Sequence, residues 1–206
     1  MPQKSPGRRR SRREVAAEAT RDEVLRAARR LFAEQGYAAT TVGQVASEAG
    51  VAVQTVYSSV GSKAALVLAL NDLIDAESGV PQAAASMATV SDPESLIRAG
   101  VHLTRLLNER CGDIVGVLLA AAPADADVAA SVRDGMRRHQ DGAAQLAGRL
   151  SELGALREGT SEEQAAASFG VLTSPAGWRQ LTEGSGWSFG QAEDWLVESL
   201  TRLLLP

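Results

Sequence analysis

Cysteine and histidine are scarce in this sequence of 206 residues, which has one Cys and two His. A single thiol, Cys111, cannot form an internal disulfide, and it excludes a zinc site built from several cysteines. His102 and His139 have no second histidine or carboxylate at ligand spacing, so no metal site or other cofactor is predicted. A reducing cytoplasm is the compartment that this cysteine usage favours.

Long hydrophobic runs are also missing. The stretch that comes nearest to a membrane segment, Ile114 to Ala124, contains Pro123 and has about half of the ~20 apolar residues that a spanning helix needs. No apolar block follows the basic N-terminus, so no secretory signal is expected. No Gly-rich phosphate loop, pair of catalytic carboxylates or Ser/His/Asp set is visible, and the sequence therefore does not predict an enzyme.

Charge is distributed unevenly along the chain. The net charge is −4, but residues 1–63 carry eleven Lys and Arg against six Asp and Glu, a net +5. Residues 64–206 carry ten against nineteen, a net −9. One end of the protein is therefore suited to a polyanion, and the rest is a solvated acidic body.

The first 17 residues are predicted to form a flexible basic arm. Residues 1–13 contain two prolines and no acidic residue, a composition that cannot bury a core. The basic residues of this segment are Lys4, Arg8, Arg9, Arg10, Arg12 and Arg13. A capping box from Thr20 to Glu23 predicts the start of the first helix, whose apolar residues recur at helical spacing until Gly36.

Two very short helices follow. Thr41 to Gln44 is a second capping box, and the helix that it begins should end at Ala49-Gly50. A third helix is predicted from Val53 to Ser59, with Val56 facing inward. Two short helices joined by a Gly-containing turn of this length make a helix-turn-helix.

The remainder of the chain has the pattern of helices throughout, so the predicted fold class is all-α. We expect helices over 63–77, from 91–94 through Leu107, over 113–121 and over 128–153. Further helices should begin at Ser161, restart at Ser174-Pro175 and begin again at Ser188, where Ser-X-X-Gln patterns or a proline mark the first turns. The predicted organisation is an arm (1–17), a three-helix domain (18–63) and a larger helical domain (64–206).

Residues Thr20 to Lys63 resemble the DNA-binding domain of the TetR family of transcriptional regulators. The resemblance rests on Arg29-Arg-Leu-Phe-Ala-Glu-Gln-Gly-Tyr37, Thr40-Thr-Val42, Val45-Ala46, Ala49-Gly-Val51, Thr55-Val-Tyr57 and Ser62-Lys63. It covers about a fifth of the chain. It implies a dimeric regulator with a ligand-binding and dimerisation domain after the helix-turn-helix.

The helix from Val53 to Ser59 is predicted to read DNA. The major groove is about 12 Å wide and admits a helix whose N-terminal side chains meet base edges. Gln54 can pair with adenine, while Val53 and the Thr55 methyl group can pack on a thymine methyl group. The alternative is that these residues are only the exposed side of a small helix.

A second set of residues is predicted to hold the phosphate backbone. Their hydroxyl or ammonium groups lie at predicted helix ends, where phosphate binds readily. The set comprises Thr40, Thr41, Tyr57 and Lys63, with Ser59 as a further DNA contact and Arg8, Arg9, Arg10, Arg12 and Arg13 in the arm. For Thr41 the alternative is a helix cap, and for the arm it is a charged tail that aids solubility. Tyr37 is expected to pack between helices.

The sequence departs from the family pattern at the third helix. Ala52 stands where a serine commonly caps this helix, and Ser59 and Val60 replace the aromatic residues that usually follow the tyrosine. Losing a cap costs roughly 1 kcal/mol. The third helix is therefore expected to be only partly ordered without DNA.

The resemblance also implies roles for residues in the larger domain. His102, Met87 and Cys111 are candidates for an effector pocket that takes a small apolar or amphipathic molecule. Trp178, Trp195 and Leu196 are candidates for a homodimer interface. The predicted function is a repressor that a small-molecule effector releases from a palindromic double-stranded DNA operator, and the alternative is a dimeric DNA-binding regulator without an effector.

Overall fold

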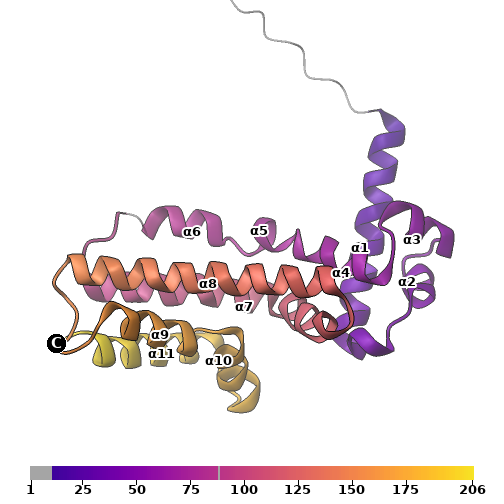
Figure 1. The fold of residues 1–206 in the computed structure, drawn as a ribbon. Helices are drawn as coiled ribbons and strands as arrows, with labels where there is room; N and C mark the ends of the chain where they lie inside the picture. Colours follow the sequence, from indigo (N-terminus) through magenta and orange to yellow (C-terminus); the bar gives the residue numbers. More distant parts are fainter. Residues whose placement is uncertain (1–10, 88) are drawn as a thin grey trace, which may run out of the picture.

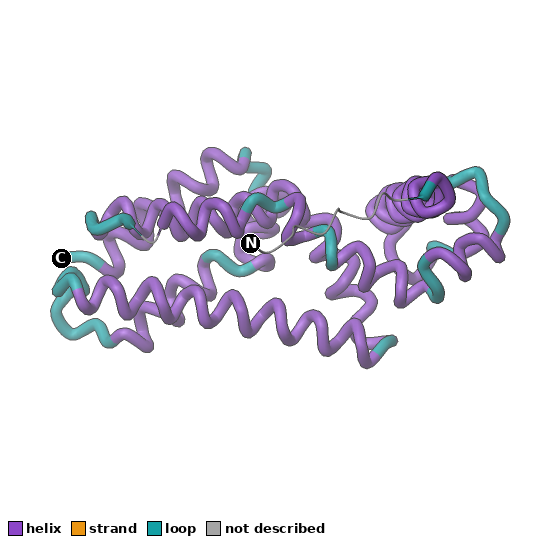
Figure 2. Tube along the Cα trace, turned by 90° about the horizontal axis from the view of Figure 1, so that it is seen from above, coloured by secondary structure: helices purple, strands orange, loops and turns teal. Residues whose placement is uncertain are grey.

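The computed structural model describes residues 11–87 and 89–206, and every regular element in these ranges is helical, as predicted (Figures 1 and 2). Among the described residues, no helix combines the length and apolar character that crossing a bilayer requires. In chain order the elements are α1 (Arg12–Ala39), α2 (Val42–Glu48), α3 (Val53–Ser59), α4 (Lys63–Asn71), α5 (Ile74–Glu77), α6 (Val80–Met87), α7 (Pro93–Ala121), η1 (Ala122–Ala124), α8 (Ala126–Glu152), α9 (Glu162–Leu172), α10 (Pro175–Arg179), η2 (Gln180–Gly184) and α11 (Phe189–Leu204).

Helix α1 begins earlier than the sequence predicted. Its N-cap is Ser11, whose hydroxyl accepts from the Glu14 amide while the Glu14 carboxylate accepts from the Ser11 amide. The capping box predicted at Thr20 is wrong, because the Thr20 hydroxyl donates to the Ala16 carbonyl inside the helix. Residues 12–17, predicted as part of a flexible arm, are therefore helical. A capping box satisfies two free amides wherever it occurs, and this one lies nine residues upstream of Thr20.

The helix-turn-helix has the predicted bounds. Thr41 caps α2 through a reciprocal pair of bonds with Gln44, and Gly50 adopts a φ of 67° in the turn that follows. Helix α3 runs from Val53 to Ser59, and Val56 is completely buried. Ala52 is the N-cap of α3 and makes no side-chain bond, so the missing cap is confirmed, and the partial order of α3 without DNA stays a prediction.

Two predictions for the larger domain are wrong in detail. The helix expected over 63–77 is divided into α4 and α5 at Asp72 and Leu73, and the two helices expected over 91–121 are one continuous helix, α7. The sequence contains no proline or N-cap signal strong enough to break α7 near Cys111. Helix α8 and the helix starts at Ser161, Ser174 and Ser188 are confirmed.

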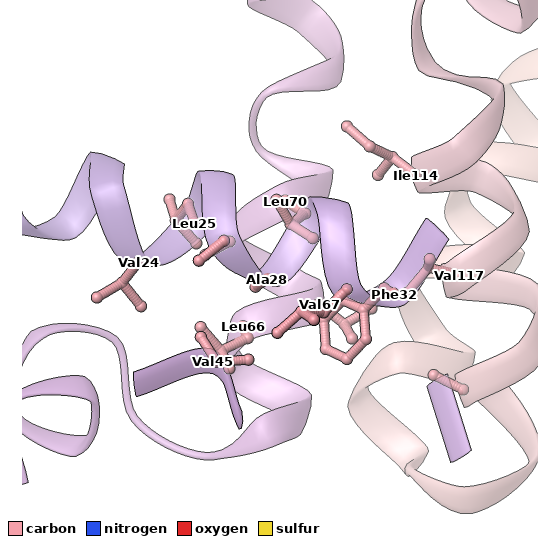
Figure 3. Packing of buried hydrophobic residues seen from close by; sticks show 14 of the residues in the cluster. Val24, Leu25, Ala28, Phe32, Val45, Leu66, Val67, Leu70, Ile114 and Val117 are labelled. Carbon is pink, nitrogen blue, oxygen red and sulfur yellow. The ribbon is translucent and has the colours of Figure 1, made fainter. Parts of the chain in front are cut away.

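The buried residues form two hydrophobic clusters, and each includes residues of α7 and α8. The first joins α1, α2, α3 and α4 to the C-terminal half of α7 and the start of α8, as Figure 3 shows for Phe32, Val45, Leu66 and Val117. The second joins the N-terminal half of α7 and the C-terminal half of α8 to α9, α10 and α11. The helix-turn-helix therefore shares its core with the larger domain.

An ion-pair cluster reinforces this junction. Arg29 of α1 donates through Nε and Nη2 to both carboxylate oxygens of Asp113 on α7, at 2.5 and 2.9 Å. It also donates to Glu77 of α5 at 2.5 Å and to the Arg110 carbonyl at 2.8 Å. The hydrogen bonds to Asp113 raise the pKa of Arg29 above its ordinary value, so this charge is permanent. Bidentate arginine–carboxylate pairs fix orientation as well as distance.

Helices α7, α8 and α9 pack closely at Gly100, and we expect a methyl group there to destabilise the protein. The added Cβ atom would lie 2.5 Å from Cδ1 of Leu146 and 3.0 Å from Cζ of Phe169. Overpacking of this kind lowers the free energy of unfolding by about 1–3 kcal/mol. Gly112→Ala is the control on the same helix, where no atom lies within 4 Å, and it should gain about 0.5–1 kcal/mol from helix propensity. Urea unfolding at equal protein concentration measures both, and equal stabilisation by the two changes would contradict the packing argument.

The uncapped start of α3 leads to a second stability prediction. Ala52 has extended backbone angles, φ −71° and ψ 149°, which are those of a normal N-cap. Ala52→Ser adds a hydroxyl that can accept from a free first-turn amide, and it should raise the free energy of unfolding by about 1 kcal/mol. Ala52→Val adds bulk without an acceptor and should give no gain. Urea unfolding compares the variants, and an equal effect of Ser and Val would show that capping does not limit α3.

Candidate nucleic-acid interface

The three side chains predicted to read bases occupy the start of α3. Val53 is 45% exposed, Gln54 is exposed and Thr55 is half-buried. They are followed by Val56, which anchors the opposite side of the helix in the first hydrophobic cluster. Figure 1 shows α2 and α3 at the end of the molecule farthest from α9 and α11. This side of α3 is thus open to a large partner.

Thr40 and Thr41 differ in whether their hydroxyl groups are accessible to a partner. Thr40 is 1% exposed, and its hydroxyl donates to the carbonyls of Leu31 and Gly36. The prediction that this side chain holds phosphate does not fit that geometry, because the hydroxyl is buried and already bonded. Thr41 is exposed and caps α2, and its hydroxyl also donates to Gln44 Oε1 at 2.9 Å.

Lys63 is held against the end of α1. Its Nζ atom donates to the Ala38 carbonyl at 3.3 Å and lies 4.2 Å from the centre of the Tyr37 ring. Partial burial lowers the pKa of Lys63 from its ordinary value. Tyr37 also packs on Phe32, with ring centres 5.8 Å apart, so its predicted place between helices is confirmed. The ammonium group is thus positioned before any phosphate arrives.

Tyr57 and Ser59 lie on the C-terminal half of α3. Tyr57 is 51% exposed, so its ring does not form part of the core. Ser59 is half-buried, and its hydroxyl donates to the Val56 carbonyl of the same helix at 3.3 Å. Tyr57 is therefore available to DNA, whereas the hydroxyl of Ser59 is turned toward its own backbone.

Two of the five arginines predicted to contact DNA from the arm lie within the described residues. Arg12 and Arg13 are exposed in the first turn of α1, which projects beyond α2 and α3 in Figure 1. Arg8, Arg9 and Arg10 lie outside the described residues. The two described arginines are thus carried on a helix that continues into the helix-turn-helix.

The three effector candidates do not meet in one cavity. His102 is exposed on α7, and its Nδ1 atom is 2.8 Å from Glu193 Oε1 of α11. Cys111 is buried in the first hydrophobic cluster, which raises the pKa of its thiol, and Met87 packs on the second.

A pocket of about 310 Å³ lies elsewhere, open at the surface between α7 and α11 and lined mainly by charged residues such as Glu94, Arg98 and Arg202. Among the described residues, no group of three His, Cys, Asp or Glu side chains is placed to hold a metal ion.

The three residues predicted to form the dimer interface are not all exposed on one surface. Trp178 is 1% exposed and Leu196 is fully buried, and both belong to the second hydrophobic cluster. Their side chains pack inside one chain and leave no area for a partner, so the prediction that they form the interface does not fit. Trp195 is 40% exposed on α11 and packs edge-on against Trp187. Helix α11 therefore carries both buried and exposed large apolar residues, and Leu203 is exposed as well, at 46%.

Two arginines important to the arrangement had no assigned role in the sequence predictions. Arg29 lies inside the stretch that carries the family resemblance, but its partners Glu77 and Asp113 are 48 and 84 residues away. Arg21 donates to the Ser59 carbonyl, 38 residues away. No local pattern signals such pairs, because they arise only when α1 is packed against its neighbours.

The N-terminal part of the chain matches a known protein family. Residues 24–70 match the family profile described as "Bacterial regulatory proteins, tetR family". This range covers all of α1 after Glu23, the helix-turn-helix and α4 up to Leu70. No curated protein gives a significant sequence match to the chain.

Solved structures share the fold over nearly the whole chain. A protein described as a transcriptional regulator from Saccharomonospora viridis, in complex with choline, has a TM-score of 0.73 at 20% identity and covers 92% of this chain and 99% of its own. A TetR-family protein from Mesorhizobium loti gives 0.66 at 19% identity, with 96% and 100% covered. The regulator FadR from Bacillus subtilis, in complex with stearoyl-CoA, gives 0.70 at 13% identity, with 88% and 98% covered. The family match therefore covers residues 24–70, which hold the helix-turn-helix, and the solved structures show that the chain shares their fold over nearly its whole length.

Proposed function

We propose that this protein is a dimeric repressor that binds a palindromic operator through α3 and is released by a small-molecule effector, without enzymatic activity. The observation that carries the DNA-binding role is the exposed start of α3, held by one buried residue behind a capped α2. In this assignment residues 18–63 bind DNA and residues 64–206 sense the effector and dimerise. Binding to DNA places its action in the cytoplasm.

The proposed contacts fall into two kinds. Gln54 pairs with an adenine edge, and Val53 and the Thr55 methyl group pack on thymine. Thr41, Tyr57 and Lys63 contact phosphates and set the position of the domain on the duplex without reading sequence. The buried hydroxyl of Thr40 is not part of this set.

Arg12 and Arg13 extend the positive surface along α1 toward the neighbouring groove. They are exposed at the end of the helix that carries the rest of the domain. Basic arms contribute phosphate attraction, and some lie in the minor groove beside the major-groove site. We assign these two residues to that attraction.

A homodimer accounts for recognition of a palindrome, because twofold symmetry in the protein matches twofold symmetry in the operator. The exposed side of α11 supports an interface there. Trp195 and Leu203 are two turns apart on this helix and are 40% and 46% exposed. They take the place of Trp178 and Leu196 in the interface that we propose.

The shared core supplies a route from an effector to DNA. Arg29 joins α1 to both α7 and α5, so a shift of α7 moves the helix that carries the DNA-binding domain. In a dimer the two copies of α3 must lie about 34–36 Å apart to enter successive major grooves, and a small change in this spacing weakens binding. Effector coupling of about 1–3 kcal/mol is usual for such systems.

The alternative function is a dimeric DNA-binding regulator with no small-molecule effector. It is favoured by the placement of His102, Met87 and Cys111, which do not share a cavity. The structural relatives that contain choline and stearoyl-CoA favour an effector of some kind. Screening small molecules for release of the bound operator distinguishes these two functions.

Substitutions in α3 should separate residues that read sequence from residues that hold phosphate. Gln54→Ala and Thr55→Ala each remove a base-edge contact, and we expect each to cost about 1–3 kcal/mol on the operator and little on random DNA. Lys63→Ala should weaken both duplexes alike and reduce the slope of log K against log salt by about one. The operator is first identified as the duplex that the protein selects from a random library. Fluorescence anisotropy at two salt concentrations then measures the binding of each variant to this duplex and to random DNA.

Glu34→Gln is the control for this set, because Glu34 is exposed on α1 and is not among the residues proposed to contact DNA. It should change neither the preference for the operator nor the salt slope by more than a small amount. If Gln54→Ala and Thr55→Ala both retain the full operator preference, α3 is not the recognition helix.

The dimer interface is tested by charge on α11. Trp195→Glu with Leu203→Glu places two like charges where each chain would meet its copy, so we expect a monomer at micromolar concentration where the unchanged protein is a dimer. Val15→Glu is the control. Val15 is an apolar residue that is 53% exposed in the first turn of α1, outside the proposed interface on α11. Sedimentation equilibrium measures the mass of each. A dimer that survives the double change would place the interface on another surface.

A further inference from the structure

The recognition helix is held in place at few points. Helix α3 has seven residues, and within it only Val56 is buried. Its first turn has no side-chain cap, because Ala52 lacks an acceptor. Val51 and Val60, which flank α3, are partly buried against the same cluster, so apolar contacts hold one side of the helix and both of its connections. A polar contact at the end of α3 adds to these in fixing the direction in which the helix presents Gln54 and Thr55.

That contact is made by Arg21 of α1. Its Nη1 atom donates to the Ser59 carbonyl oxygen at 2.8 Å, in a partly buried position. Ser59 is the last residue of α3, where the final carbonyls have no partner within the helix and carry the negative end of its dipole. A guanidinium group is always charged in proteins, so this is a charge-assisted bond. It joins the C-terminal end of α3 directly to α1.

We propose that Arg21 is a positioning residue for DNA recognition. It contacts no base itself, but its bond to the Ser59 carbonyl joins the apolar contacts of Val56 and Val60 in fixing the C-terminal half of α3, and so the direction of the helix. The proposal rests on the proposed function, in which Gln54 and Thr55 read the operator. Arg21 acts through them by holding the helix that presents them.

A different role for the same arginine is direct contact with phosphate. The two roles predict different salt dependences. A phosphate contact releases counterions, so its loss lowers the salt slope by about one and weakens operator and random DNA alike. Loss of a positioning bond leaves the number of phosphate contacts unchanged, and it weakens the operator selectively.

The test compares Arg21→Met with Arg26→Met. Methionine keeps an unbranched stem and removes the donor and the charge. Arg26 lies on the same helix, is more than half exposed and pairs only at the surface with Glu23 among the contacts described, so its change removes an equal charge from the same domain. Each variant is titrated against the selected operator and a scrambled duplex at two salt concentrations, with circular dichroism at the assay temperature to verify folding.

We expect Arg21→Met to weaken operator binding about tenfold, the scale of one lost base contact, with scrambled DNA and the salt slope matching those of Arg26→Met. Arg21→Lys keeps a cationic donor and should recover part of the loss. If the methionine variant does not fold, Arg21→Lys is compared with the unchanged protein in its place. In a Gln54→Ala background, Arg21→Met should cost much less on the operator, because the side chain that it positions is gone.

Three results would overturn the inference: equal operator binding by Arg21→Met and Arg26→Met, a salt slope that falls by about one for Arg21→Met alone, or full additivity with Gln54→Ala. The first of these, with a normal loss for Gln54→Ala, rejects the role of Arg21 and leaves the proposed function intact. Retention of operator preference by both Gln54→Ala and Thr55→Ala rejects the recognition helix itself.

Discussion

The packing of α1 against α4 and α7 is the contact on which the rest of the structure depends. One side of α1 buries Ala28 and Phe32 in a cluster that continues into α4, α7 and the start of α8. On the same helix Arg29 pairs with Asp113 and Glu77, so apolar burial and a bidentate ion pair act at one junction. Helix α1 lies across the long axis of α7 and α8, and it carries α2 and α3 to the end of the molecule (Figures 1 and 2).

This arrangement makes α1 the structural link between the helix-turn-helix and the larger helical domain. The Arg29–Asp113 pair ties α1 to α7, and packed cores and bidentate pairs shift as units, so the coupling proposed above would run through this contact. In contrast, α3 is attached through Val56 and through Arg21, which ties its last carbonyl to α1. Helix α3 thus contributes one buried residue to the core that it shares with α1, whereas α1 contributes six.

Local signals in the sequence predicted much of the fold and of the site. The capping box at Thr41 and the glycine at position 50 specify α2 and its end, because side-chain caps and positive φ are properties of a few neighbouring residues. The bounds of α3 and the lack of a cap at Ala52 followed from the same kind of reasoning. The same signals predicted the range of α8 and the start of α11 at Ser188, although they did not say which apolar side chains remain exposed.

By itself the sequence thus determined the all-α class, the helix-turn-helix and the position of the basic end. Tertiary structure decided which side chains are available. Thr40 has its hydroxyl enclosed by α1, and Trp178 and Leu196 are covered by α7 to α11, so residues that looked suited to DNA or a partner are part of the core. Arg21 and Arg29 became structural because residues 38 to 84 positions away were brought to them. Burial and long-range pairing depend on how helices are assembled, and no spacing within one helix encodes them.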